Sequence, residues 1–181
     1  MSDRADKIVA VFGANYPQHG EASYETALQV GLALGRLGYA VVNGGYGGTM
    51  EASARGAKQA GAKTIGVTCT LWRSSPNRFI DDVIVTDNLY HRVERLIELG
   101  SGGFVVLPGG TGTLVELAMA WELMCKKLAA ARPLVLMGDF WRPLIGMMES
   151  ARSGSSKFVS LATDSREIEK FFALKQPHNG H

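Results

Sequence analysis

The sequence contains little cysteine and no recognisable set of metal ligands. Cys69 and Cys125 are the two cysteines among 181 residues, and they form no CxxC or Cys/His spacing. A disulfide framework or a structural zinc site needs such spacings. HExxH motifs and clustered carboxylates are also missing from the sequence. We therefore expect two buried, reduced thiols, no metal and no cofactor, a pattern typical of a cytoplasmic protein.

Long apolar runs and a strong charge of one sign are missing as well. No apolar run approaches the ~20 residues of a membrane span. The first residues, "MSDRADKIVAVFGA", lack the apolar core and cleavage site of a signal peptide. The 19 basic and 17 acidic side chains are interspersed and leave a formal charge of +2, with no basic stripe for a phosphate backbone. We expect a soluble protein with neither a nucleic-acid nor a membrane partner.

The length and composition predict one domain. With 46% hydrophobic residues, a chain of this size can bury most of its apolar surface in a single core. We place this domain at residues 1–175. The polar tail "QPHNGH", residues 176–181, is expected to be disordered.

Short β-branched runs alternate with longer segments of helical periodicity. The expected strands are Ile8–Phe12, Ala40–Asn43, Thr64–Thr68, Asp82–Thr86, Phe104–Pro108 and Pro133–Met137. The expected helices are Ala22–Leu37, Thr49–Ala60, Asn88–Leu99, Thr113–Leu128 and Trp141–Ala151. "KFVSL" and "DSREIEKFF" add an edge strand and a closing helix. Such alternation predicts an α/β fold, a doubly wound parallel sheet flanked by helices. Because the strands are apolar without alternation, we expect both sheet faces to be covered.

Three glycine-rich or small loops lie between expected strands and helices. They are "GAN" (Gly13–Asn15), "GGYGG" (Gly44–Gly48) and "GGTGT" (Gly109–Thr113). In a parallel sheet such loops gather at the carboxyl ends of the strands, where ligands bind. Glycine lets backbone N–H groups approach a ligand closely, and helix N-termini attract anions. The three loops therefore predict a phosphate site.

Two common phosphate-binding motifs do not fit these loops. A Walker A loop ends in Gly-Lys-[Ser/Thr], and no such sequence occurs in the chain. The dinucleotide fingerprint G-x-G-x-x-G is replaced by "FGANYP" after the first expected strand. The second expected strand ends in Asn43, at the position where the dinucleotide fingerprint has an acidic residue that binds the ribose. Both a nucleoside triphosphatase and an NAD-dependent oxidoreductase are disfavoured.

The stretch "LPGGTGTLVE" places Glu116 one turn inside an expected helix. The pair Thr113 and Glu116 has capping-box spacing, in which Thr113 caps the helix and Glu116 reaches back to the cap N–H. The alternative is a catalytic carboxylate at the sheet edge, which needs an opposite charge nearby to remain ionised. Spacing alone leaves both interpretations open.

An arginine that could meet Glu116 comes from "NLYHRVERLIELG". On a helix, Leu89, Val93, Leu96 and Ile97 form one apolar face, and Arg92 lies at its border. Arg95 projects away from that face with Glu94 and Glu98. Arg92 is therefore the arginine expected to look inward, although a surface position beside the core would also fit.

The motifs "PGGTGTLVE" (Pro108–Glu116) and "GGYGGTMEASARGA" (Gly44–Ala57), together with the arginine helix, resemble the LOG ("Lonely guy") family. This resemblance implies a Rossmann-like fold, a homodimer and phosphoribohydrolase activity. That activity cleaves a nucleoside 5′-monophosphate, such as a cytokinin riboside monophosphate, into free base and ribose 5-phosphate. Family members are also described as possible lysine decarboxylases. That description fits poorly, because Lys126 and Lys127 fall late on a helix, far from the strand ends.

The resemblance also implies roles for individual residues. Glu116 matches the essential glutamate, and Gly109, Gly110, Thr111, Gly112 and Thr113 match the phosphate loop. Arg92 matches the helix arginine, although "HR" stands where "HER" is usual, so that Arg95 is the alternative. Gly45, Gly48 and Thr49 of the second loop are expected to help hold the phosphate, and Gly13 and Asn15 of the first loop to contact the nucleotide.

Two further expectations concern partners. Related folds with GGxGT loops include molybdenum-cofactor carriers and nucleotide sensors, so a binding protein without catalysis is the alternative to an enzyme. The segment Leu114–Met124 is apolar nearly all round, which predicts a subunit interface and a homodimer. Cover by the chain's own C-terminal elements is the other explanation for this apolar helix.

Overall fold

The computed structural model describes residues 7–173, so the tail expected to be disordered at 176–181 lies outside the described residues. The described strands form one parallel sheet in the order β4-β3-β2-β1-β5-β6-β7. The strands are β1 (Ile8–Phe12), β2 (Ala40–Asn43), β3 (Thr64–Cys69), β4 (Asp82–Thr86), β5 (Gly103–Val106), β6 (Leu134–Met137) and β7 (Ser160–Ala162).

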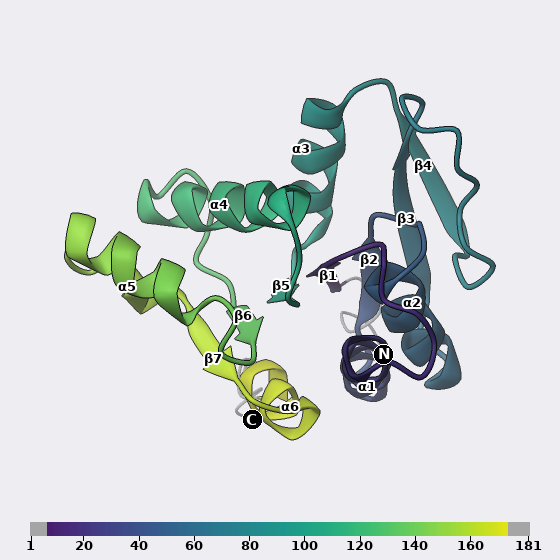
Figure 1. The fold of residues 1–181 in the computed structure, drawn as a ribbon, viewed down its shortest axis with the longest axis horizontal. Coiled ribbons are helices and arrows are strands. Elements are labelled where there is room, and N and C mark those ends of the chain that lie inside the picture. The colour runs from purple at the N-terminus through teal and green to yellow at the C-terminus, as the bar shows by residue number, and fades with distance from the viewer. Residues whose placement is uncertain (1–6, 174–181) are drawn as a thin grey trace, which may run out of the picture.

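Helices cover both faces of this sheet. They are α1 (Ala22–Arg36), α2 (Thr49–Gln59), α3 (Leu89–Leu99), α4 (Thr111–Cys125), α5 (Arg142–Ala151) and α6 (Ser165–Ala173), with a 3₁₀ turn at Ser156–Phe158. Figure 1 shows α3 and α4 above the sheet and α1 and α6 below it. The predicted α/β Rossmann-like architecture, with a closing strand and helix at the C-terminal end, is confirmed.

Each face has its own apolar core because neighbouring strand residues point to opposite sides. Val9 and Val11 of β1 pack with α1, α2 and α6, whereas Ala10 and Phe12 pack with α3 and α4. The inner strands are buried along their whole length, except for the partly buried Ile8 at the start of β1. Strands buried on both faces explain the unbroken apolar runs in the sequence.

The chain reverses its direction of travel across the sheet next to β1. From β1 it winds outward through β2 and β3 to the edge strand β4, and it then returns to β5 on the other side of β1. Such a switch point opens a crevice at the carboxyl ends of the two central strands. The loops that leave β1 and β5, which start at Gly13 and Leu107, border this crevice.

One expectation about the sheet was wrong at its β4 edge. β4 is largely exposed, with Val83 44% and Val85 62% accessible, so helices do not cover both faces of this strand. No helix was expected between β3 and β4, and the structure has none there. The chain returns through the irregular segment 70–81, which is anchored by the backbone of Asn77 to Gly45. An edge strand has one neighbouring strand only, and β4 lies at this edge of the sheet.

Candidate functional site

A cavity of about 640 Å³ opens at the switch point, between the loops after β1, β2, β3 and β5. Its size is in the range of small-molecule sites. Its walls combine backbone from glycine-rich loops with aromatic side chains and one pair of opposite charges. The predicted gathering of the three loops is therefore present in the structure.

The loop after β5 leads directly into the N-terminus of α4. Gly110 is the N-cap residue and no side chain caps the helix. Thr113 is the third residue of α4 and Glu116 the sixth, so the expected helix start at Thr113 was two residues late. The capping-box interpretation is wrong for this reason, because Thr113 lies inside the helix. The backbone N–H groups of the first turn are left to face the cavity.

Glu116 points into the cavity floor and meets Arg92. Both residues are 7% exposed, and Arg92 Nη1 lies 3.4 Å from Glu116 Oε1. Arg92 projects from the first turn of α3 and Glu116 from the second turn of α4. The inward direction predicted for Arg92 is confirmed. A catalytic role for the pair remains a proposal.

Burial governs the charge of Glu116. Removal of the carboxylate from water raises the pKa of Glu116 from 4.5 to about 7, and the charge and hydrogen bond of Arg92 lower it only in part. We expected Arg92 to keep this carboxylate ionised. Arg92 acts in that direction, but one long contact does not offset the loss of hydration. A pKa near neutrality suits a group that takes up and returns a proton.

Arg92 is held by contacts on several sides. Its Nε donates to the carbonyl of Val67 at 2.9 Å, and its guanidinium lies 5.3 Å from the ring of Trp72 and 5.8 Å from that of Tyr46. A side chain at Gly44 would overlap Arg92 Nη2, so only glycine leaves room there. The loop Gly44–Gly48 therefore leaves the space that the Arg92 guanidinium occupies.

The alternative arginine lies elsewhere. Arg95 is on the outer face of α3, where it pairs with Glu98 at 3.0 Å, and both side chains are about half exposed. His91, next to Arg92, is also exposed and contacts Asp87 and Asn88 at the start of α3. Of the two candidates, Arg92 is the arginine at the cavity.

Most of the predicted phosphate-binding residues line the cavity. They are Gly13, Asn15, Gly110, Thr111, Gly112 and Thr113. Gly45, Gly48, Thr49 and Gly109 are not among the lining residues, and a direct contact of these four with a phosphate stays a prediction.

The structure gives a physical reason for each exception. The N–H of Gly45 donates to Asn43 Oδ1. Thr49 donates both its N–H and its hydroxyl to the carbonyl of Ala14. Gly48 packs on the backbone of Asn15 with φ +67°, and Gly109 packs against Thr113. These residues fix the loops behind the cavity wall.

The sequence analysis missed part of the cavity lining. Tyr46 and Trp72 contribute aromatic rings, and Ser74 and Ser75 contribute hydroxyls. A signal was present, because Trp72 is an isolated tryptophan in the polar stretch "TLWRSSPNRF" that follows β3. Arg78, from the same stretch, is exposed and stacks on Phe79 instead of lining the cavity.

Among residues 7–173, no group of three or more His, Cys, Asp or Glu side chains is placed to hold a metal ion. None of the residues that line the cavity is a lysine, so a lysine-based Schiff-base site is not formed there. In the same part of the chain, none of the helices has both the length and the apolar character needed to cross a membrane.

The chain resembles proteins of known sequence and structure. It is 40% identical over 119 residues to the cytokinin riboside 5′-monophosphate phosphoribohydrolase of Mycobacterium tuberculosis, a match that covers 64% of this chain and 63% of that protein. A molybdenum cofactor binding protein from Rippkaea orientalis superposes with a TM-score of 0.77 at 24% identity, over 94% of this chain and 98% of that one. The molybdenum cofactor carrier protein of Chlamydomonas reinhardtii superposes with a TM-score of 0.70 at 26% identity, over 94% of this chain and 97% of that one.

The resemblance inferred from the glycine signature is confirmed by a family profile. The profile matches residues 6–160, which include all the loops and both charged residues of the cavity. By this match, the chain belongs to the SLOG cluster4 family.

Proposed function

We propose that the protein is a nucleoside 5′-monophosphate phosphoribohydrolase, which cleaves AMP or a cytokinin riboside monophosphate into free base and ribose 5-phosphate. The observation that carries the proposal is the buried pair of Glu116 and Arg92 on the floor of the cavity, directly beside the N-terminus of α4. The 40% identical mycobacterial relative with this name supports it.

The N-terminus of α4 is the proposed phosphate site. Gly110, Thr111, Gly112 and Thr113 line the cavity, and the first intrahelical bond runs from Leu114 N–H to the carbonyl of Gly110. The N–H groups of the residues between them have no partner inside the helix and can donate to phosphate oxygens. The dipole of a 15-residue helix adds attraction for an anion.

A phosphate held there would place the ribose over Glu116, one helical turn further along α4. As the bond from C1′ to the base nitrogen breaks, its electron pair leaves with the base and positive charge grows on the ribose ring. The ionised Glu116 stabilises this charge or orients a water molecule and accepts its proton, while the oxygen bonds to C1′. Glu116 then returns this proton to the departing base, which restores the carboxylate. Arg92 positions the carboxylate, and binding of the phosphate orients the reacting carbon.

The test is product analysis by chromatography after incubation with AMP and with an N6-prenylated AMP. We expect release of free base and ribose 5-phosphate by the parent protein and no release by Glu116→Gln. Glu122→Gln is the matched control, because Glu122 lies on the same helix but is exposed and pairs with Lys126. Equal turnover by Glu116→Gln and the parent would overturn the proposal.

The alternative is a carrier or sensor that binds a phosphorylated ligand without cleaving it. The similarity to solved molybdenum cofactor carriers is the observation in its favour. A carrier would leave both nucleotides intact under conditions where binding is measured by calorimetry. The same experiment therefore decides between the two functions.

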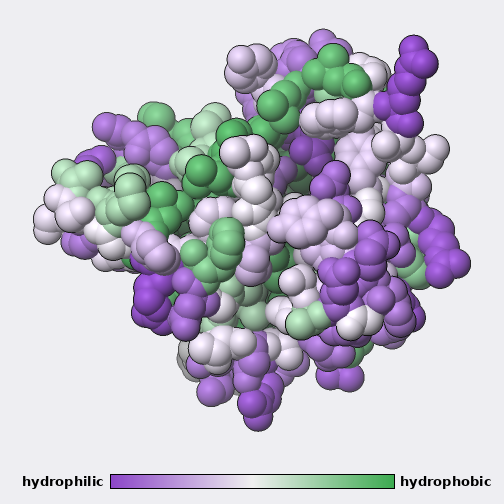
Figure 2. All heavy atoms as spheres, in the orientation of Figure 1, coloured by the Kyte–Doolittle hydropathy of each residue, from purple (hydrophilic) through white to green (hydrophobic). Residues whose placement is uncertain are grey.

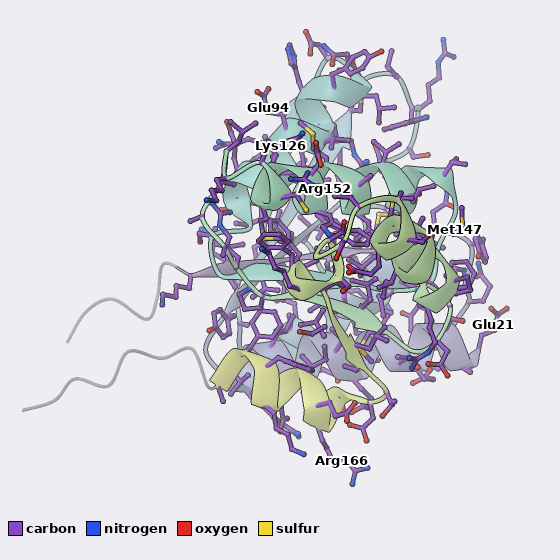
Figure 3. All side chains as sticks on the ribbon, turned by 90° about the vertical axis from the view of Figure 1, so that its left-hand side faces the viewer. Glu21, Glu94, Lys126, Met147, Arg152 and Arg166 are labelled. Atoms are coloured by element: carbon purple, nitrogen blue, oxygen red, sulfur yellow. The ribbon has the colours of Figure 1, made fainter. Side chains whose placement is uncertain are left out.

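We also propose that the protein works as a homodimer through the exposed face of α4 and α5. The Trp121 indole donates to the carbonyl of Ser155, so the chain's own C-terminal part covers one side of α4. Other apolar side chains on the two helices stay at least a third exposed, namely Leu114, Val115, Met119, Met147 and Met148. Hydrophobic surface gathers over this region in Figure 2. Figure 3, viewed from that side, shows Met147 toward the right of this face and the charged residues Arg152 and Lys126 toward its centre and left. An apolar patch with a charged border fits a second copy of the chain.

A further inference from the structure

An aromatic pair packs against Arg92, the arginine that contacts Glu116. The rings of Tyr46 and Trp72 meet edge to face, with centroids 5.9 Å apart, and both line the cavity. The Arg92 guanidinium lies within 6 Å of both rings and contacts Glu116 with Nη1. The cavity lining therefore contains a chain of contacts from Glu116 to Arg92 and on to the aromatic pair, and Glu116 follows the N-terminus of α4 by about one turn.

Trp72 differs from the other tryptophans of the chain. Trp121 and Trp141 are 6% and 5% exposed, and each indole N–H donates to a backbone carbonyl. Trp72 is 43% exposed, although a large apolar ring gains most from burial. Its exposed surface belongs to the cavity wall, so a ligand in the cavity can cover it.

The aromatic pair is held in place before any ligand arrives. The Tyr46 hydroxyl accepts a hydrogen bond from the N–H of Cys69 at 3.0 Å and donates to its carbonyl at 3.3 Å. The N–H of Trp72 donates to the same carbonyl at 3.2 Å. The Tyr46 ring is thus fixed by its hydroxyl, and the Trp72 ring packs on Tyr46 and Arg92. Rings that are already ordered lose little conformational entropy when a flat molecule stacks on them.

We propose that Trp72, supported by Tyr46, is the platform on which the base of the nucleotide stacks, and that it determines which bases are accepted. The proposal rests on the proposed nucleotide substrate. In a nucleoside monophosphate the phosphate, C1′ and the base follow in that order. The contacts in the cavity connect the α4 N-terminus, Glu116 with Arg92, and the aromatic pair in a matching sequence. Aromatic side chains bind bases through their π-faces. A purine covers more of the Trp72 ring than a pyrimidine, so purine nucleotides are the preferred class.

A purely structural role for Trp72 makes a different prediction. If the ring served only to hold Arg92, its removal would disturb the Glu116–Arg92 pair and lower kcat for every substrate. A base platform instead acts on binding of the base. Its removal would raise KM for AMP and leave the affinity for ribose 5-phosphate, which has no base, unchanged.

The first test uses tryptophan fluorescence in the Glu116→Gln background, so that AMP stays intact. We expect AMP to quench the emission and ribose 5-phosphate to leave it unchanged, because the other two tryptophans are buried. Trp72→Phe should abolish the quenching while keeping a ring for stacking. Quenching by AMP that persists in Trp72→Phe would overturn the proposal.

The second test measures kinetics and calorimetric binding with AMP, CMP and ribose 5-phosphate. We expect Trp72→Ala to weaken AMP binding about tenfold or more and to reduce the preference for AMP over CMP. Trp72→Phe, which keeps an aromatic ring, should retain most of the affinity for AMP. Unchanged affinity for AMP, or equal loss for AMP and ribose 5-phosphate, would contradict the platform. If the parent binds AMP with quenching but cleaves nothing, the proposed hydrolase fails while the platform stands.

Discussion

The raised pKa of Glu116 makes a quantitative prediction about stability and activity. The difference between its ordinary value of 4.5 and about 7 in the folded protein corresponds to about 3 kcal/mol. Below about pH 4.5 the carboxyl is protonated in both the folded and the unfolded chain. Between pH 4.5 and about pH 7 the carboxyl is ionised in the unfolded chain but still largely protonated in the folded chain, so the free energy of unfolding falls as the pH rises. The fall ends above about pH 7, where the carboxyl is ionised in both states.

The perturbation is Glu116→Gln, which removes the titration and keeps the shape. Arg92 is charged throughout this range and loses its partner in the variant, which adds an offset that does not depend on pH. We therefore expect the free energy of unfolding of the parent, relative to the variant, to fall by about 3 kcal/mol between pH 4.5 and about 8. Urea denaturation of both proteins at several pH values measures this difference.

The pH dependence of turnover checks the same group independently. If the ionised carboxylate is the reactive form, kcat/KM for AMP rises with pH, with an apparent pKa near 7, and levels off above it. A stability difference that does not vary with pH would refute the reasoning about burial, as would a midpoint below about pH 5 in both experiments. If kcat/KM does not vary with pH while the stability difference falls as expected, only the role of the ionised Glu116 in turnover is refuted.

Three further predictions follow from the contacts of the site. Gly44→Ala would displace Arg92 from Glu116, so we expect kcat in the AMP assay to fall at least about tenfold, with a stability loss of about 1–3 kcal/mol. Trp141→Phe leaves the carbonyl of Leu107 without its buried donor, so thermal unfolding should show a loss of about 1–3 kcal/mol and kcat/KM should fall. Met119→Arg places a charge in the proposed dimer face, and light scattering should then show monomers.

Each of these variants has a matched control. Gly146→Ala adds a methyl group in open space and should leave turnover unchanged. Trp121→Phe removes a similar indole hydrogen bond away from the glycine loop, so it should cost comparable stability with little effect on kcat/KM. Val85→Arg changes an exposed apolar residue on β4 and should leave the oligomeric state unchanged. Equal effects of variant and control would contradict the corresponding assignment.

The sequence predicted the order of elements well because hydrophobic periodicity is a local property. Strand β1 was predicted with its exact bounds, and α1, α2 and α3 agree to within one residue at either end. The larger errors are at α4, which begins at Thr111 and ends at Cys125. Helix ends depend on capping and on neighbouring chain, which a periodic pattern does not record.

Glu116 and Arg92 could be identified because each stands out against a local pattern, a carboxylate in an apolar helix and an arginine at the border of an apolar face. The phosphate loop could be recognised because glycine and threonine between a strand and a helix have a local conformational meaning. By itself, the sequence therefore determined the strands and helices of a parallel α/β fold, the position of the glycine loops and the identity of the two charged residues.

Only the tertiary structure decided which of these groups meet and what state they adopt. Gly45 and Thr49 turn their donors inward, whereas Tyr46 and Trp72 face the cavity, because contacts between distant segments fix the loops. The pKa of Glu116 likewise depends on how much water the surrounding elements exclude. Side-chain direction, burial and the pairing of charges are properties of packed neighbours, and these neighbours lie far apart along the chain.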